Sequence, residues 1–151
     1  MSRVSKSKGP SFVQLHIWLL RSPAWRDLSP NARCVYLGLK ERYNGRNNGE
    51  IAFSAREAGA VINASHHTGN RALAELAEHG FVLVTEQSNF DRKVKVARQY
   101  LLTEARDDRP GVSPLSMKNF MRWQPENPKH SLTGAQNSRT HETESRKVAL
   151  K

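Results

Sequence analysis

Residues 54–86, SAREAGAVINASHHTGNRALAELAEHGFVLVTE, decide the fold, because they predict two short helices, a tight turn between them and a strand after them. Ser54 and Glu57 have the spacing of a capping box, in which the serine caps the helix start and the glutamate reaches back to the serine amide. Residues 63–65 predict the tight turn, and Ser65 can cap the helix that follows. Small residues on both helices let the two backbones approach closely.

The second helix is expected to run from Ser65 to His79, with Gly80 where a left-handed residue closes a helix. Helical spacing divides it into two faces. The inward face carries small and apolar residues, namely Gly69, Ala72, Leu73, Leu76 and Ala77. The outward face then carries His67, Asn70, Arg71, Ala74 and Glu78.

The flanking sequence predicts further elements on both sides. Apolar residues from Phe12 to Leu20 suit a short buried helix, and a turn or short helix follows it. Ser29-Pro30 starts a longer helix that ends before the turn formers at 44–49, and a short strand follows at 51–53. After Gly80, strands at 81–86 and 94–103 are joined by a polar loop at 87–92. These two strands predict a β-hairpin.

Composition and charge limit the classes of function that the chain can have. The chain has 151 residues with 24 Lys+Arg against 14 Asp+Glu, a net charge of +10, so a polyanion is a natural partner. The single cysteine, Cys34, excludes an internal disulfide and is expected to be partly buried. No apolar run approaches the length of a membrane span, and we expect a cytoplasmic, nucleoid-associated protein.

The chain divides into four parts by composition. We expect a flexible basic arm at 1–10, a single domain at 11–103, a linker with a short amphipathic segment at 104–128, and a disordered tail at 129–151. The domain is predicted to be mainly α with a small β-hairpin (α+β). Its element order is that of a winged helix-turn-helix.

That order indicates double-stranded DNA as the ligand, with the second helix in the major groove and the hairpin on the phosphate backbone. Arg71 could donate two hydrogen bonds to guanine, and Asn70 could pair with adenine. The start of a helix favours phosphate, and a basic wing at about 86–98 would contact phosphates. The candidates for these phosphate contacts are His66, His67 and Thr68 at the helix start, and Arg92, Lys93 and Lys95 in the wing. A solvated helix face and a lysine-protected sheet edge are the alternatives.

Several stretches resemble one known family. These are SPAWRDLSPNARCVYLGLKERYNGRNNGEIAFSAREAG at 22–59, NASHHTGNRALAELAEHGFV at 63–82, RKVKVARQYLLT at 92–103 and FMRW at 120–123. Over roughly residues 10–128 the chain resembles small bacterial helix-turn-helix proteins that are common in α-proteobacteria. The resemblance implies a winged helix related in form to plasmid and phage replication-initiator modules, and it brings no activity or target site. The segment RDDRPGVSPLS departs from that pattern.

The remaining hypotheses concern partners and chemistry. Phe120, Met121 and Trp123 either pack back on the domain, the interpretation we favour, or form an interaction peptide for a replication or transcription partner. The domain could instead be a protein-interaction module without DNA contact, or an RNA-binding module, although no aromatic platform for bases is evident. A homodimer is possible. No catalytic motif, metal site or cofactor motif is recognisable, so we expect no enzyme and no cofactor.

Overall fold

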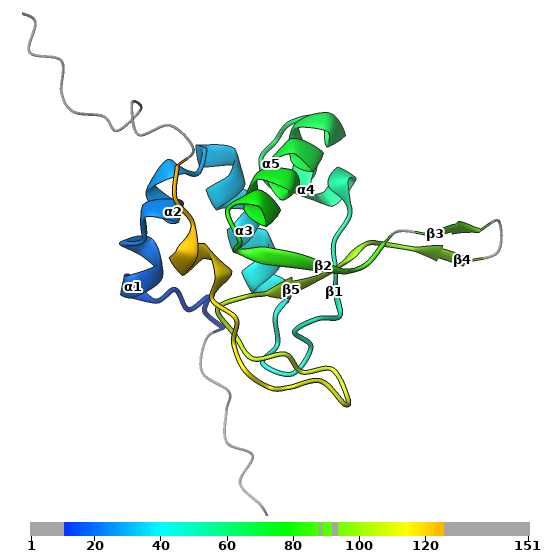
Figure 1. Cartoon of the computed structure of the whole chain (residues 1–151). Coiled ribbons are helices and arrows are strands. Elements are labelled where there is room, and N and C mark those ends of the chain that lie inside the picture. The colour runs from blue at the N-terminus through cyan, green and yellow to red at the C-terminus, as the bar shows by residue number, and fades with distance from the viewer. Residues whose placement is uncertain (1–10, 88, 92–93, 126–151) are drawn as a thin grey trace, which may run out of the picture.

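The computed structural model describes residues 11–87, 89–91 and 94–125, and within them the chain is a mixed α/β fold (Figure 1). It contains five α-helices and a small three-stranded antiparallel sheet. The helices are α1 (Ile17–Leu20), α2 (Pro23–Asp27), α3 (Pro30–Arg42), α4 (Ala55–Val61) and α5 (His66–Glu78). The strands are β1 (Ile51–Ala52), β2 (Val82–Glu86), β3 (Asn89–Asp91), β4 (Val94–Val96) and β5 (Gln99–Leu102), and a 3-10 helix, η1 (Asn119–Arg122), follows.

The sheet has the strand order β1-β5-β2, so β5 is the central strand and pairs with a neighbour on each side. Val82 stands opposite Leu102 in one ladder, and Ile51 stands opposite Tyr100 in the other. Strands β3 and β4 form a separate two-stranded ladder. Figure 1 shows this β3–β4 hairpin extending away from the body, while α3, α4 and α5 lie together beside the sheet.

The sheet differs from the predicted single hairpin in two respects. The expected loop at 87–92 contains β3, and the expected strand at 94–103 is divided into β4 and β5. The register of β2 against β5 shifts between Val84 and Glu86, which bends the strand as a bulge does. Between β4 and β5, the carbonyl of Arg98 accepts a hydrogen bond from the Phe53 amide at 3.0 Å, so Arg98 pairs with the chain just after β1.

The predicted helix caps are confirmed. The Ser54 amide donates to a Glu57 carboxylate oxygen at 2.8 Å and the Glu57 amide donates to the Ser54 hydroxyl at 3.2 Å, which completes the capping box. Ser65 accepts from the Thr68 amide, and Ser29 caps α3 in the same way. Gly80 has a φ of +77°, a left-handed conformation that a residue without a Cβ adopts without strain.

The first helix is shorter than its apolar pattern predicts. Helix α1 begins at Ile17, and residues 11–16 have no regular structure. Phe12 is 83% exposed, so it does not contribute to the buried face that was expected to begin there. Leu19 is the fully buried residue of α1, and it carries the packing of this segment on the core.

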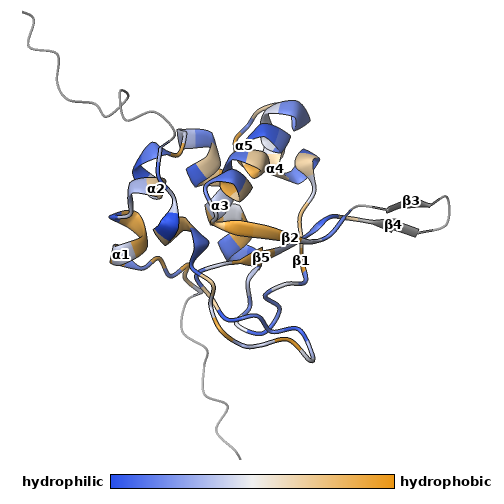
Figure 2. Cartoon of the chain, in the orientation of Figure 1, coloured by the Kyte–Doolittle hydropathy of each residue, from blue (hydrophilic) through white to orange (hydrophobic). Residues whose placement is uncertain are grey.

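The core is built around aromatic side chains from distant parts of the chain, and apolar residues gather where the helices meet the sheet (Figure 2). Phe81 lies at its centre, with its ring centroid 5.6 Å from Tyr36 and 5.7 Å from Trp25, both edge-on. On another side Phe81 stacks on Phe120, 4.7 Å away and nearly parallel. Offset and edge-on ring pairs of this kind stabilise a core beyond the area that they bury.

The segment after β5, assigned by composition to a linker, is joined to the domain by buried polar groups. Asn48 is fully buried, and its side-chain amide donates to the carbonyls of Leu102 and Arg106 while its oxygen accepts from the Leu102 amide. Lys40 and Glu104 form a buried ion pair. Burial, and secondarily the Glu104 carboxylate, hold the pKa of Tyr36 well above its ordinary value.

Among the residues that the structure describes, none of the helices combines the length and the apolar character that a bilayer crossing requires.

Candidate nucleic-acid interface

Helices α4 and α5 touch through their backbones. A Cβ atom added to Gly69 would lie 2.3 Å from the Gly59 amide nitrogen and 2.4 Å from the Ala55 carbonyl oxygen. Gly59 in turn has the Ser65 and Ala64 carbonyls under 3 Å from where its own Cβ would stand. The turn between the helices closes through Asn63, which adopts a left-handed φ of 53°. The sequence prediction of small residues at the contact between the two helices therefore describes this packing well.

The C-terminal half of α5 is held from three sides. The Glu75 carboxylate accepts hydrogen bonds from the amide and, at 2.7 Å, the hydroxyl of Ser29 at the start of α3. The His79 ring places Nε2 2.9 Å from the Asp27 carboxylate and Nδ1 2.9 Å from the Glu75 carbonyl, and it stacks on Trp123 with centroids 4.6 Å apart. These contacts orient α5, so its first two turns have a defined direction relative to the body.

The predicted outward face of α5 is exposed. Asn70 and Arg71 lie on the surface, and so do His66 and His67 at the helix start, while Thr68 is half-buried. The two histidine rings are neighbours, with centroids 4.0 Å apart. The predicted inward face is confirmed as well: Gly69, Ala72, Leu73 and Leu76 are buried, and Ala77 is half-buried against the core. The structure thus brings five of the eight candidate contact residues together on one end of one helix.

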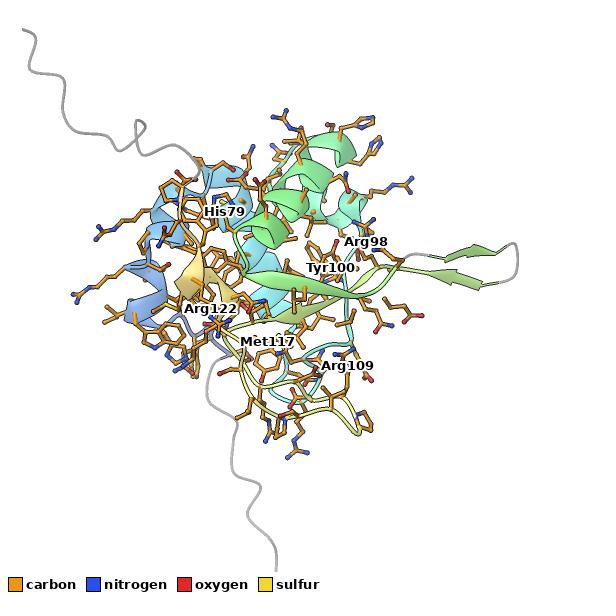
Figure 3. All side chains as sticks on the ribbon, in the orientation of Figure 1. His79, Arg98, Tyr100, Arg109, Met117 and Arg122 are labelled. Atoms are coloured by element: carbon orange, nitrogen blue, oxygen red, sulfur yellow. The ribbon has the colours of Figure 1, made fainter. Side chains whose placement is uncertain are left out.

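The structure does not describe the side chains of the three wing candidates. Arg92 and Lys93 lie outside the described residues, and for Lys95, which belongs to β4, the structure describes the backbone alone. Figure 3 places Arg98 and Tyr100 near the base of the β3–β4 hairpin, on the side that faces α4 and α5. Burial raises the pKa of Tyr100, and the Arg98 guanidinium opposes that shift.

Sequence reasoning did not assign a role to the basic residues of α3 and α4, the two helices that pack against α5. Arg56 is exposed on α4. Arg42 donates a hydrogen bond of 2.8 Å to the Glu57 carboxylate, so it offsets the acidic charge at the start of α4. The Ser54 hydrogen bonds and then Arg42 lower the pKa of Glu57 to about 2. The sequence pattern gave no signal for these residues, because their surroundings depend on how α3 and α4 pack.

The segment Phe120–Trp123 packs on the domain, as the favoured interpretation expected. Phe120 is fully buried between Phe81 and Trp18, and Trp123 is half-buried against His79. Phe120 is consequently not accessible to a partner in this structure. Of the three residues considered for a partner contact, Met121 is the exposed one.

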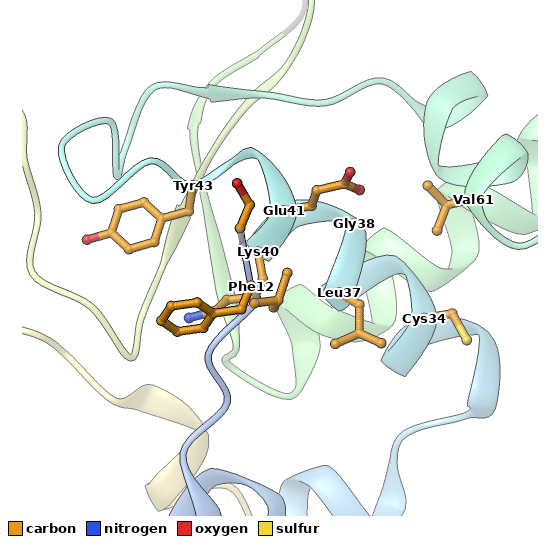
Figure 4. A pocket seen from close by; sticks show the side chains of 10 residues that line it. Phe12, Cys34, Leu37, Gly38, Lys40, Glu41, Tyr43 and Val61 are labelled. Atoms are coloured by element: carbon orange, nitrogen blue, oxygen red, sulfur yellow. The ribbon is translucent and has the colours of Figure 1, made fainter. Parts of the chain in front are cut away.

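A shallow groove of about 580 Å³ lies on another part of the surface, between the N-terminal segment, α3 and α4 (Figure 4). Its floor includes Leu37 and Gly38, and its rim includes Phe12 and Val61. Cys34 also lines it and is exposed, which corrects the expectation of a partly buried thiol, because its position on α3 turns away from the core. The described lining contains no histidine that would activate the thiol as a nucleophile.

Metal-binding side chains do not gather in groups of three or more within the described part of the chain. His66 and His67 have no carboxylate or thiol partner that would complete a coordination sphere there.

Comparisons of the chain with protein-family models, with curated proteins and with solved structures return no match.

Proposed function

We propose that the protein is a winged helix-turn-helix that binds double-stranded DNA, with α5 in the major groove and the β3–β4 hairpin as the wing. The observation that carries the proposal is the combination of an exposed polar end of α5 with a C-terminal half that is held by Ser29 and, through His79, by Asp27. A helix about 10–12 Å across fits a major groove about 12 Å wide. Its orientation must be fixed for side chains to read bases, and these contacts fix it.

The roles of the residues follow from their positions. Asn70 and Arg71 would reach base edges, since amide and guanidinium groups form paired hydrogen bonds with adenine and guanine. His66, His67 and Thr68 would lie against phosphate at the helix start. The Thr68 amide already donates to Ser65, so the contact there would come from the side chains and the other free amides.

The wing would add contacts that carry little sequence information. The basic side chains of Arg92, Lys93 and Lys95 would bind phosphate groups, and each phosphate that they neutralise releases condensed counterions. The net charge of +10 supports association with a polyanion in the same way. The biological role would be transcription regulation or plasmid- or phage-type replication initiation.

The experiment recovers bound duplexes from a random pool with the full chain and then measures their affinity by fluorescence anisotropy. Arg71→Ala should weaken binding to the selected duplex by about 1–3 kcal/mol and relax its base preference. Arg26→Ala removes the same charge from an exposed position on α2, so it serves as the matched control and should retain both affinity and preference.

The wing is tested in the same assay by its salt dependence. Lys93→Ala should weaken binding to all duplexes alike and reduce the slope of log affinity against log salt by about one. Two results would contradict the proposal. One is equal affinity losses in Arg71→Ala and Arg26→Ala, and the other is no binding of random duplex at about 10 µM protein and low salt, where nonspecific binding is ordinarily detectable. The second result would favour the alternative, a protein-interaction module without DNA contact.

A further inference from the structure

A second exposed surface lies on the side of the molecule away from the β3–β4 hairpin and the start of α5 (Figure 1). It is formed where α1 meets the segment that contains η1, and we call it the α1–η1 surface. Its members are large apolar side chains that the core does not cover, namely Ile17, Trp18, Leu115, Met117 and Met121. Figure 2 shows the apolar character of α1 at this place, and Figure 3 shows Met117 and Arg122 beside it.

Direct contacts hold the two halves of this surface together. The Trp18 ring stacks on Phe120 with centroids 5.8 Å apart, and the Lys118 ammonium lies 5.0 Å from the centre of the Trp18 ring. The Lys118 amide also donates to the Thr103 carbonyl at 2.8 Å, which ties the segment to the end of β5. Because Phe120 is fully buried, these contacts fix η1 against α1.

The apolar residues remain strongly exposed in spite of this fixed framework. Ile17 is 63% exposed, Met121 is 55% exposed and Leu115 is 76% exposed. A large exposed apolar patch on a small domain marks a contact site, and the two segments that carry these side chains meet at the Trp18–Phe120 and Trp18–Lys118 contacts. Methionine side chains suit such a site because they adapt to the shape of a partner.

The charge around the patch selects the kind of partner. Arg21, Lys118 and Arg122 are exposed on its rim. Residues 11–26 and 114–125, the two segments that carry the surface, contain no aspartate or glutamate. A second copy of this chain would bring the same positive rim against this one, and like charges across an interface are unfavourable.

DNA and an anionic membrane, two negatively charged partners, also fit this surface poorly. DNA phosphate offers no apolar group to the five apolar side chains between the basic ones. An anionic bilayer is commonly bound by a long amphipathic helix, whereas α1 has four residues. We infer that the α1–η1 surface binds an acidic protein segment that presents apolar side chains between its carboxylates, so that the protein couples its proposed DNA-binding face to a partner protein on a separate face.

The probe is a synthetic peptide of about 16 residues, with leucine and phenylalanine on one helical face and glutamate elsewhere. Its controls are a peptide of scrambled order and a peptide with lysine in place of every glutamate. Binding to the full chain is followed by isothermal titration at about 0.1 M salt, where the exposed charges are partly screened. The acidic amphipathic peptide should bind about tenfold or more tightly than either control.

Variants locate the binding. Met121→Glu should reduce the affinity for the acidic peptide about tenfold or more, because it places a carboxylate in the apolar patch. Val112→Glu makes the same change at an exposed valine on the turn after β5, outside the surface, and should leave the affinity unchanged. Circular dichroism confirms that both variants are folded.

Other outcomes overturn the inference. Equal losses in Met121→Glu and Val112→Glu would mean that net charge alone attracts the peptide. Loss of peptide binding in Arg71→Ala would place it on α5, and Arg71→Ala separates the two proposals because it should affect duplex binding only. Self-association that Met121→Glu abolishes, or binding to phosphatidylglycerol vesicles without a preference for the acidic peptide, would assign the surface to a second copy or to a lipid surface instead.

Discussion

Replacing Gly69 with alanine places a methyl group against the backbone of α4. The new carbon would lie 2.3 Å from the Gly59 amide nitrogen, 2.4 Å from the Ala55 carbonyl oxygen and 2.9 Å from the Ala58 carbonyl carbon. Favourable contacts of a carbon lie at about 3.5–4.0 Å, so α5 and α4 must separate by about 1 Å. No side-chain rotation relieves the clash, because all three atoms belong to the main chain.

The magnitude follows from two opposing effects. Overpacking a tight contact costs about 1–3 kcal/mol or more, and the backbone clash puts this case at the upper end. Alanine gains about 1 kcal/mol over glycine in a helix interior. The net expected loss in the free energy of unfolding is about 2 kcal/mol, which lowers the melting temperature by about 10 °C in a domain of this size.

Gly38→Ala is the matched control, since Gly38 is also a buried helical glycine. Its new carbon would meet side-chain atoms, with Val61 Cγ2 at 3.1 Å and Phe53 Cζ at 3.3 Å. Val61 is exposed, so it can move by a few tenths of an ångström, and the helix propensity of alanine makes this variant neutral or stabilised by up to about 1 kcal/mol. Urea unfolding followed by circular dichroism measures both variants.

The separation of the two helices also has a functional readout that depends on the proposed function. A displaced α5 should lower duplex affinity in Gly69→Ala and leave it unchanged in Gly38→Ala. If Gly69→Ala is as stable as the wild type, or if Gly38→Ala is the more damaged of the two, the close backbone contact between α4 and α5 is refuted.

Three further predictions concern stability. Phe120→Ala should lower the free energy of unfolding by about 3–5 kcal/mol in urea, because it removes a fully buried aromatic ring that stacks on Phe81. A loss below about 1 kcal/mol would mean that the segment detaches freely. Asn48→Ala should lower the free energy of unfolding by about 3 kcal/mol or more in the same assay. It leaves the backbone groups that Asn48 binds without a partner, and each such group costs about 1–3 kcal/mol. An unchanged stability would contradict this reasoning. Glu57→Gln tests a pH dependence: Ser54 and Arg42 lower the pKa of Glu57 from 4.5 to about 2, so its carboxylate contributes stability that is fully present above about pH 4.5 and is lost as the pH falls towards 2. The free energy of unfolding, measured between about pH 2 and 6, should therefore fall less with decreasing pH in the variant than in the wild type. Identical pH profiles for the two proteins would rule the contribution out.

Local sequence signals predicted the helices around the candidate site well. The Ser54–Glu57 capping box, the Ser65 cap and the left-handed Gly80 all involve residues within a few positions of each other, so the chain specifies them without long-range contacts. The same holds for the two faces of α5, since a period of 3.6 residues assigns Gly69 and Leu73 to one side and Asn70 and Arg71 to the other. The roles of the exposed residues stay predictions.

The contacts that orient the site depend on residues far apart in sequence. The sequence analysis gave Glu75 no role, yet its carboxylate accepts hydrogen bonds from Ser29 at the start of α3, 46 positions away. Asn48 reads as one of several turn formers, yet it binds both backbone groups of Leu102, 54 positions away. No local pattern distinguishes these polar residues from their exposed neighbours, because their partners are set by packing.

The C-terminal part of the domain shows the same difference between local sequence signals and long-range packing. Composition separated residues 104–128 from the domain, because the segment is charged and rich in turn formers. In the tertiary structure its Glu104 pairs with Lys40 and its Phe120 enters the core. The sequence alone determined which helices form and which side of α5 is polar, because hydrogen bonds and side-chain periodicity within a helix are local. Tertiary packing decided where α5 points, how the hairpin divides and which apolar residues remain on the surface, because those depend on the shape of a core built from distant segments.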